Sequence, residues 1–282
     1  DDKTILADLS FGVEKGSTFV VLGENGSGKS VIVKLLVGII EKDTGMAYIN
    51  GKDVSTRGSD VKTITGYMPQ QIDLDNDLTI LENLEIFGRL QGLSKSDSIE
   101  SALDWSEKLD IFESLNNLPK EISFGKRRIV QFIRALIHNP EVIILDEPTL
   151  GLDPHTKLKI WDILDKLHGD KTIVFTSQDF TEAERYADRI AILHNGNIKM
   201  DGTLDRLIET THGLTRYRLS FRKPPTDQFM SRLKEFPRIL RPQVKGTDLE
   251  FYSRERKQFF NAIELALKYD LKDIDNSICR LQ

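Results

Sequence analysis

The segment 23–30, with the sequence GENGSGKS, constrains the possible folds of this chain more than any other feature. It follows the pattern G-x-x-x-x-G-K-S and lies between two apolar runs, TFVVL and VIVKLLVGII. Glycines let the backbone turn its N–H groups toward an anion, the lysine reaches the β- and γ-phosphates, and the serine hydroxyl ligates Mg²⁺. The alternative is a glycine-rich turn that happens to precede Lys-Ser, but a strand before it and a helix after it favour phosphate binding. The residues expected in the phosphate-binding loop are Gly23, Asn25, Gly26, Ser27, Gly28, Lys29 and Ser30.

The chain up to residue 210 alternates short apolar segments with segments of helical periodicity. Strands are expected at 18–22, 46–49, 142–145, 172–177 and 189–193, and helical segments at 77–117, 127–138, 157–167 and 181–187. Strands that alternate with helices predict a mainly parallel sheet whose ligand lies at the carboxyl ends of the strands. The expected fold class is therefore α/β, with a P-loop NTPase (RecA-like) core.

An acidic pair follows the most apolar of these strands, in the segment VIILDE that ends at Glu147. A buried strand places Asp146 at its tip, where a carboxylate can hold the water shell of Mg²⁺. The next residue, Glu147, can polarise an attacking water as general base. A charged turn is the usual explanation for Asp-Glu-Pro after a strand, but the upstream phosphate-binding loop favours a nucleotide site.

Six motifs in this order resemble the nucleotide-binding subunit of an ATP-binding-cassette (ABC) transporter, over residue 3 to about residue 210. They are GENGSGKS, GYMPQ at 66–70, ISFGKRR at 122–128, VIILDE, GLD at 151–153 and TSQD at 176–179. The resemblance implies that Gln70 reaches Mg²⁺ and the attacking water, and that Asp153 belongs to the D-loop. It also implies an inserted helical subdomain at about 72–136, where DLTILENL resembles the exporter (ABC-2-like) branch.

Two of the six motifs depart from the family pattern. In ISFGKRR, Phe124 replaces the first glycine of the signature and Lys126 replaces the glutamine. Ser123 and Gly125 keep the chemistry of a capped helix N-terminus, which in the family meets the γ-phosphate bound on a partner subunit. In TSQD, Gln178 stands where the family usually has histidine; glutamine can donate a hydrogen bond but cannot carry a proton charge.

The last part of the chain differs from the rest in charge and in pattern. From residue 211 onward there are 15 Lys and Arg against 9 Asp and Glu, whereas the preceding residues hold 24 against 35. This change predicts a separate module, with a boundary at about residue 210. The pattern predicts the order βαββαβ, with strands at 216–222, 239–244, 249–252 and 277–281 and helices at 226–236 and 254–269. We expect domains at 1–210 and 211–282, the second being regulatory or dimerising.

The resemblance implies an ATPase that powers a membrane transporter, with ATP and Mg²⁺ as ligands. The implied partners are an integral membrane permease subunit and a second nucleotide-binding subunit, identical or not, and the implied location is the cytoplasmic face of the membrane. No apolar run approaches the roughly 20 residues that span a bilayer. One alternative stays open: a low-turnover module that dimerises with ATP, because Gln178 replaces the histidine. A ribosome- or DNA-acting cassette is disfavoured, since the chain has neither a second nucleotide domain nor a long coiled coil, and no nucleic-acid partner is expected.

Overall fold

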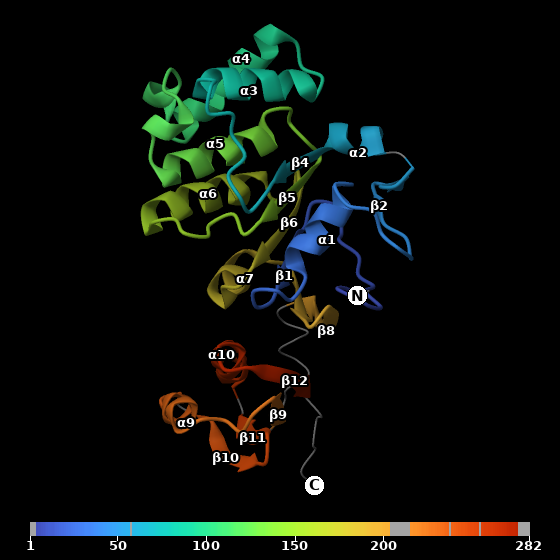
Figure 1. Cartoon of the computed structure of the whole chain (residues 1–282), viewed down its shortest axis with the longest axis vertical. Coiled ribbons are helices and arrows are strands. Elements are labelled where there is room, and N and C mark those ends of the chain that lie inside the picture. Colours follow the sequence, from blue (N-terminus) through green and yellow to red (C-terminus); the bar gives the residue numbers. More distant parts are fainter. Residues whose placement is uncertain (1–3, 57, 204–214, 237, 254, 276–282) are drawn as a thin grey trace.

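The chain is built around a six-stranded sheet with the strand order β4-β5-β6-β1-β7-β8 (Figure 1). The computed structural model describes residues 4–56, 58–203, 215–236, 238–253 and 255–275. The strands of this sheet are β4 (Thr65–Met68), β5 (Val142–Asp146), β6 (Thr172–Ser177), β1 (Thr18–Leu22), β7 (Arg189–His194) and β8 (Asn197–Thr203). All neighbours are parallel except β7 and β8, which are antiparallel. The expected α/β class is confirmed.

Alternate residues of the central strands belong to two different apolar cores. In β1, Val20 and Leu22 pack in one core, and Phe19 and Val21 pack in the other. β5 follows the same alternation. Every residue of β1, β5 and β6 is buried. A parallel strand that is covered on both faces is a continuous apolar run in the sequence. For this reason the sequence predicted these strands.

Helices cover both faces of this sheet, and a polar side chain caps the start of most of them. The helices of the body are α1 (Lys29–Leu36), α2 (Gly58–Ile64), α3 (Ile80–Leu90), α4 (Lys95–Lys108), α5 (Phe124–Leu136), α6 (Pro154–Leu167) and α7 (Phe180–Tyr186). Thr79, Ser94, Ser123, Asp153 and Asp179 each accept a backbone N–H at the start of the following helix. These caps begin α5 and α6 three residues earlier than periodicity indicated, because a capped first turn needs no apolar residue.

Two local expectations needed correction. The expected helical segment 77–117 consists of α3, α4 and a short 3₁₀ turn (Phe112–Ser114), with Gly92 at φ 96° between the first two. The expected strand 46–49 forms only at β2 (Tyr48–Ile49), which pairs with β3 (Lys52–Asp53). The hairpin turn lies at Asn50 and Gly51, both at positive φ, as a two-residue turn requires.

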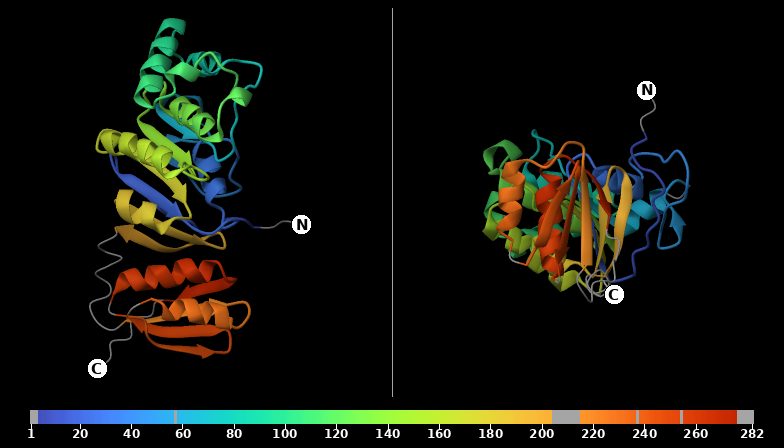
Figure 2. Two further views of the ribbon diagram at one scale, coloured as in Figure 1. Left: turned by 90° about the vertical axis from the view of Figure 1, so that its left-hand side faces the viewer. Right: turned by 90° about the horizontal axis from the view of Figure 1, so that it is seen from below.

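The C-terminal domain has the expected order βαββαβ and a sheet of its own, in which all neighbours are antiparallel (Figure 2). The sheet order is β10-β11-β9-β12. The elements are β9 (Thr215–Phe221), α9 (Asp227–Lys234), β10 (Leu240–Lys245), β11 (Asp248–Ser253), α10 (Arg256–Leu267) and β12 (Leu271–Asp275). The last strand precedes the expected segment 277–281, which lies outside the described residues. The helix expected at 254–269 ends earlier in the structure, at Leu267, because Asp270 at φ 60° already turns the chain into β12.

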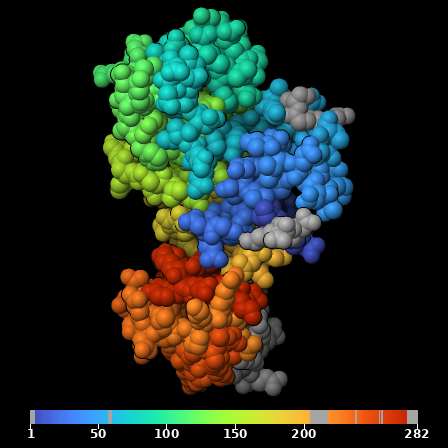
Figure 3. Space-filling model, in the orientation of Figure 1, coloured from blue at the N-terminus to red at the C-terminus, as the bar shows by residue number. Residues whose placement is uncertain are grey.

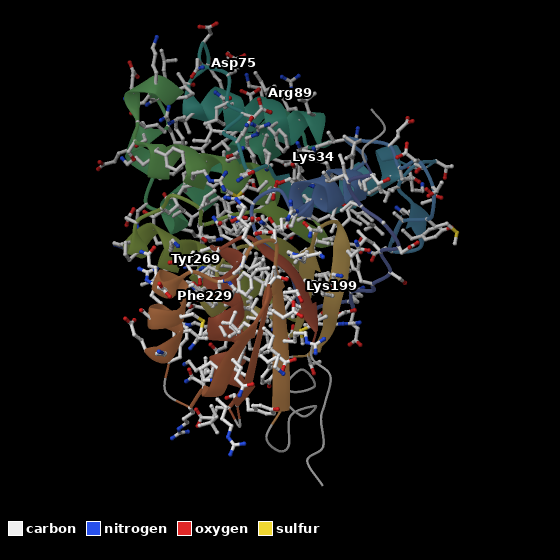
Figure 4. The ribbon with its side chains drawn as sticks, turned by 60° about the horizontal axis from the view of Figure 1, so that its bottom comes forward. Lys34, Asp75, Arg89, Lys199, Phe229 and Tyr269 are labelled. Carbon is white, nitrogen blue, oxygen red and sulfur yellow. The ribbon has the colours of Figure 1, made fainter. Side chains whose placement is uncertain are left out.

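A separate aromatic core holds the C-terminal domain together. Tyr217 stacks on Phe259 with ring centres 4.0 Å apart, and Phe229 lies edge-on to Phe221 and to Tyr269 (Figure 4). Thirteen hydrophobic residues of this domain are buried as one cluster. The domain thus has its own core, as an independently folding unit requires.

The C-terminal domain forms a distinct lobe (Figure 3), and it contacts the body at α7 and at β8, the edge strand of the large sheet. Phe180 of α7 packs against Phe260 of α10 with ring centres 5.6 Å apart. Lys199 Nζ of β8 lies 3.1 Å from Asp273 Oδ1 of β12. None of the described helices is both long enough and apolar enough to cross a membrane.

Candidate functional site

The sheet order brings together segments that are far apart in the sequence. β1, β6, β5 and β4 are consecutive neighbours in the sheet and run parallel, so their carboxyl ends lie along one edge. The phosphate-binding loop follows β1, Gln178 follows β6, Glu147 follows β5, and Gln70 lies just past the end of β4. This edge is where parallel α/β sheets bind their ligands.

The loop between β1 and α1 has the shape that a phosphate cradle needs. Gly28 has φ 108°, a conformation that favours glycine. A Cβ at Gly23 would lie 2.5 Å from the carbonyl oxygen of Leu193. Ser27 Oγ is buried and, within the described part of the chain, has no hydrogen-bond partner. A buried hydroxyl without a partner is a donor that an anion can satisfy, so these residues fit the phosphates of a nucleotide.

Lys29 and Glu147 form an ion pair at the centre of the site. Lys29 Nζ lies 3.1 Å from Glu147 Oε1, and each side chain is only 5% exposed. The same ammonium donates to the carbonyl oxygens of Gly23 at 2.8 Å and Glu24 at 3.1 Å. Burial raises the pKa of Glu147, while Lys29 opposes the shift and the Asp146 and Glu182 carboxylates add to it. The contact places the carboxyl group of Glu147 directly against the ammonium of Lys29.

Thr176 holds the acidic pair in place from the neighbouring strand. Its hydroxyl donates to Asp146 Oδ1 at 2.6 Å and accepts from the Glu147 N–H at 2.9 Å. Asp146 is buried, and Glu147 has φ 49°, a left-handed conformation that is uncommon for a residue with a side chain. This backbone conformation turns the chain sharply at the end of β5.

A third buried carboxylate lies behind this turn, on α7. Glu182 accepts hydrogen bonds from Ser177 Oγ, at 2.8 Å, and from Thr149 Oγ1. It thereby links the end of β6 to the segment that follows Glu147. Neither Thr176 nor Glu182 was predicted from the sequence to belong to the site. The polar Thr-Ser end of the otherwise apolar strand TIVFTS is the signal that could have pointed to them.

The two glutamines are both exposed at this edge of the sheet. The carbonyl oxygen of Gln70 accepts a hydrogen bond from Arg128 Nη1 at 2.7 Å. Gln178 is the first residue after β6, and Asp179 then caps α7 by accepting from the Thr181 N–H at 2.8 Å. Both side chains are therefore accessible at the end of the sheet that carries the phosphate-binding loop.

The signature and D-loop residues form a second cluster. Ser123 caps α5 by accepting from the Lys126 N–H at 3.2 Å, and Asp153 caps α6. Phe124 is 45% exposed and lies beside Gly151. A cavity of about 450 Å³ is lined by Leu109, Asp110, Ile111, Ser123, Phe124, Gly125, Lys126, Ile129, Gly151, Leu152, Asp153, Thr156 and Lys159. Lys29 and Glu147 are not among the described residues that line it, so the two clusters are separate.

Comparison with known proteins places this arrangement in one family. The ABC transporter family model matches residues 6–150. A Nod factor export ATP-binding protein I from Rhizobium sp. (strain N33) is 34% identical, over 91% of this chain and 84% of the relative. The daunorubicin resistance ATP-binding protein DrrA3 of Streptomyces coeruleorubidus is 35% identical, over 75% of this chain and 67% of the relative.

A solved structure agrees with the fold. It is the dimeric post-hydrolysis state of the ATP-binding cassette MJ0796 bound to ADP and Pi, which matches with a TM-score of 0.66 and 27% identity. The match covers 71% of this chain and 90% of the other. The chain belongs to the ABC transporter family and is an ATP-binding subunit of the ABC ATPase type.

Proposed function

We propose that this chain hydrolyses ATP to power export through an integral membrane permease subunit. It would act with a second nucleotide-binding subunit, as a peripheral protein on the cytoplasmic face of the membrane. The observation that carries the proposal is the buried contact between Lys29 and Glu147 at the end of β1 and β5. The names of the Rhizobium and Streptomyces relatives concern export and drug resistance. They support export as the direction of transport.

In this proposal, Lys29 exchanges Glu147 for the phosphates of ATP when the nucleotide binds. Ser30, Asp146 and Gln70 would hold Mg²⁺, which would offset the phosphate charge. The freed Glu147 carboxylate accepts a proton from water, whose oxygen bonds to the γ-phosphorus while the bond to the bridging oxygen of ADP breaks. The raised pKa of Glu147 makes it a better proton acceptor than an ordinary glutamate.

The second cluster completes the site of another subunit. Ser123 and Gly125 at the start of α5 offer a hydroxyl and backbone N–H groups to the γ-phosphate, and Asp153 lies beside them. Two chains would therefore clamp two ATP molecules between them, and hydrolysis would reopen the clamp.

Replacing Lys29 tests whether this loop is the nucleotide site. Lys29→Ala should abolish the rise in melting temperature that Mg²⁺-ATP gives the parent chain, because binding to the folded state alone produces that rise. Lys34→Ala is the matched control, since Lys34 is an exposed lysine of the same helix. Equal stabilisation of Lys29→Ala and the parent by ATP would refute the assignment.

Replacing Glu147 tests the proton acceptor and the clamp together. Glu147→Gln keeps the shape and removes the base, so hydrolysis should stop and ATP should trap a closed dimer. Turnover assays and size-exclusion chromatography in Mg²⁺-ATP measure both. Parent-like turnover by Glu147→Gln would exclude Glu147 as the base, and a variant that stays monomeric would count against a homodimeric clamp.

Gln178 favours a second candidate function, a low-turnover module that uses ATP mainly to dimerise. Its amide follows β6 where the family usually has histidine, and an amide cannot become charged. Losing one transition-state contact commonly lowers a rate on the order of 10²-fold, about 3 kcal/mol. Gln178→His should then raise turnover, provided that Glu147 is present. If the parent hydrolyses ATP at ordinary transporter rates and Gln178→His does not change them, only the first candidate function remains.

A further inference from the structure

Arg128 joins two catalytic segments through a single buried guanidinium. It lies on α5, five residues after the Ser123 cap, and is 1% exposed. Its Nη1 donates to the carbonyl oxygens of Pro69 at 2.9 Å and Gln70 at 2.7 Å. Its Nη2 donates to the carbonyl oxygen of Glu147 at 2.7 Å. The segment after β4 and the segment after β5 are thus held by one planar group.

The acceptors of this guanidinium explain why an arginine stands in the core. Besides the three carbonyl oxygens, Nη1 donates to Gln131 Oε1 at 3.1 Å. Burial lowers the pKa of Arg128 to about 10, although the Asp146 and Glu147 carboxylates raise it. The group therefore stays charged at neutral pH. Burying a charged guanidinium among neutral acceptors is less favourable for stability than burying an apolar side chain. Arg128 therefore contributes by fixing the geometry of the segments to which it donates.

That geometry is needed at Glu147. The left-handed conformation at φ 49° is unfavourable for a residue with a side chain unless the surroundings hold it. Thr176 Oγ1 accepts from the N–H of Glu147, and Arg128 donates to its carbonyl oxygen. The backbone is thus held on both sides of the residue. This fixes the direction in which the Glu147 carboxylate leaves the chain, toward Lys29.

The same face of α5 holds the rest of the segment after β4. Gln131 Nε2 donates to the carbonyl oxygen of Gln71, and Arg134 Nη1 donates to that of Asp73. Residues 128, 131 and 134 are spaced by three, so they lie along one side of the helix. These hydrogen bonds connect the segment after β4 to α5, and Arg128 connects it to Glu147 as well.

We propose that Arg128 is a positioning residue for ATP hydrolysis, which sets Glu147 and the Gln70 segment in register with each other. The proposal rests on the proposed role of Glu147 as the base. The hydrogen bonds of Arg128 go to the segments after β4 and β5 and to Gln131, and not to the phosphate-binding loop, so binding of the nucleotide phosphates without Mg²⁺ should not need it. Its effect should fall mainly on turnover.

The test compares Arg128→Lys and Arg128→Gln with Arg89→Lys, the same substitution at an exposed arginine of α3. Lysine keeps the charge but lacks the planar fork that bridges the two segments, and glutamine loses the charge as well. We expect kcat to fall about tenfold or more in Arg128→Lys and further in Arg128→Gln, because small misplacements of catalytic groups have effects of this size. KM for ATP should change much less than kcat, and the melting shift given by ADP without Mg²⁺ should match the parent, as should all values for Arg89→Lys.

Each other outcome separates this inference from the proposed function. If Glu147→Gln is inactive while both Arg128 variants turn over at the parent rate, the positioning role is wrong and the base assignment stands. If Glu147→Gln is as active as the parent, the base assignment fails and this inference fails with it, whereas a parent chain that does not turn over ATP would refute the proposed function itself. If Arg128→Lys loses ADP binding together with turnover, Arg128 is a general structural residue and the proposal is overturned. Should Arg128→Gln not fold, Arg128→Lys decides alone.

Discussion

At the scale of single residues, His194 connects the phosphate-binding loop to the C-terminal domain. It is fully buried at the end of β7, with Nδ1 3.5 Å from Glu24 Oε1 and Nε2 2.7 Å from the carbonyl oxygen of Lys272. Burial by itself lowers the pKa of His194, and Lys199 adds to this. The hydrogen bonds to Glu24 and to the Lys272 carbonyl outweigh both, so the net pKa is raised. The folded chain therefore favours protonated His194.

This raised pKa predicts how stability depends on pH. The stabilisation from protonated His194 is complete below the unfolded pKa of about 6.5 and is lost as pH rises through the higher folded pKa. His194→Gln retains a hydrogen-bond donor without the charge. The difference in melting temperature between parent and variant should therefore be larger at about pH 6 than at about pH 8.5. His155→Gln, at an exposed position, is the control, and an equal difference at both pH values would contradict the prediction.

At the scale of secondary-structure elements, the contact between β4 and α5 positions the segment that carries Gln70. Gly66 lies in β4, and a Cβ there would overlap the carbonyl oxygen of Ala135 and lie 2.8 Å from Pro140 Cγ. The strand can approach the helix this closely only because residue 66 has no side chain. The close approach brings the carbonyl oxygens after β4 within reach of Arg128.

Substituting this glycine tests how firmly the contact is fixed. Gly66→Ala should lower the free energy of unfolding by about 1–3 kcal/mol, because the backbone atoms around it cannot move aside without shifting an element. Urea denaturation followed by fluorescence measures the change. Gly12→Ala is the matched control, since a Cβ at residue 12 would meet no atom within 4 Å and its φ is not positive. Similar stabilities for the two variants would show that β4 can move away from α5.

At the scale of the whole molecule, the ATP-binding domain and the C-terminal domain have separate apolar cores. Within the described residues, the contacts between them include the Phe180–Phe260 pair and the Lys199–Asp273 ion pair. Both lie away from the cavity lined by the signature residues. This arrangement fits a C-terminal domain that regulates or dimerises, while the body binds the nucleotide.

A shortened chain tests that division. A chain ending at Thr210 should remain soluble and should be stabilised by Mg²⁺-ATP as much as the full chain is. Its melting temperature should be lower by about 2–4 °C for each kcal/mol of lost contact, because Phe180 becomes exposed and His194 loses its Lys272 acceptor. Failure of the shortened chain to fold would show that the C-terminal domain is part of one cooperative unit.

The local chemistry of this protein was determined by its sequence. The loop GENGSGKS, the apolar strand ending in Asp146 and Glu147, and the helix cap at Ser123 were predicted, whereas the cap at Asp153 was not. These features depend on neighbours a few residues away, because turns, caps and buried strands follow from short-range backbone preferences. The order βαββαβ of the C-terminal domain was predictable for the same reason, while the position of its last strand was not.

Only the tertiary structure decided which distant side chains meet. The order of the sheet places the ends of β1, β6, β5 and β4 side by side, and this brings Lys29 against Glu147. The roles of Thr176 and Arg128 follow from that order as well, since each is buried and bonds to atoms on another strand or loop. A sequence records which residues can donate or accept, but long-range pairing is set by how the strands and helices pack, and no spacing along the chain encodes that distance.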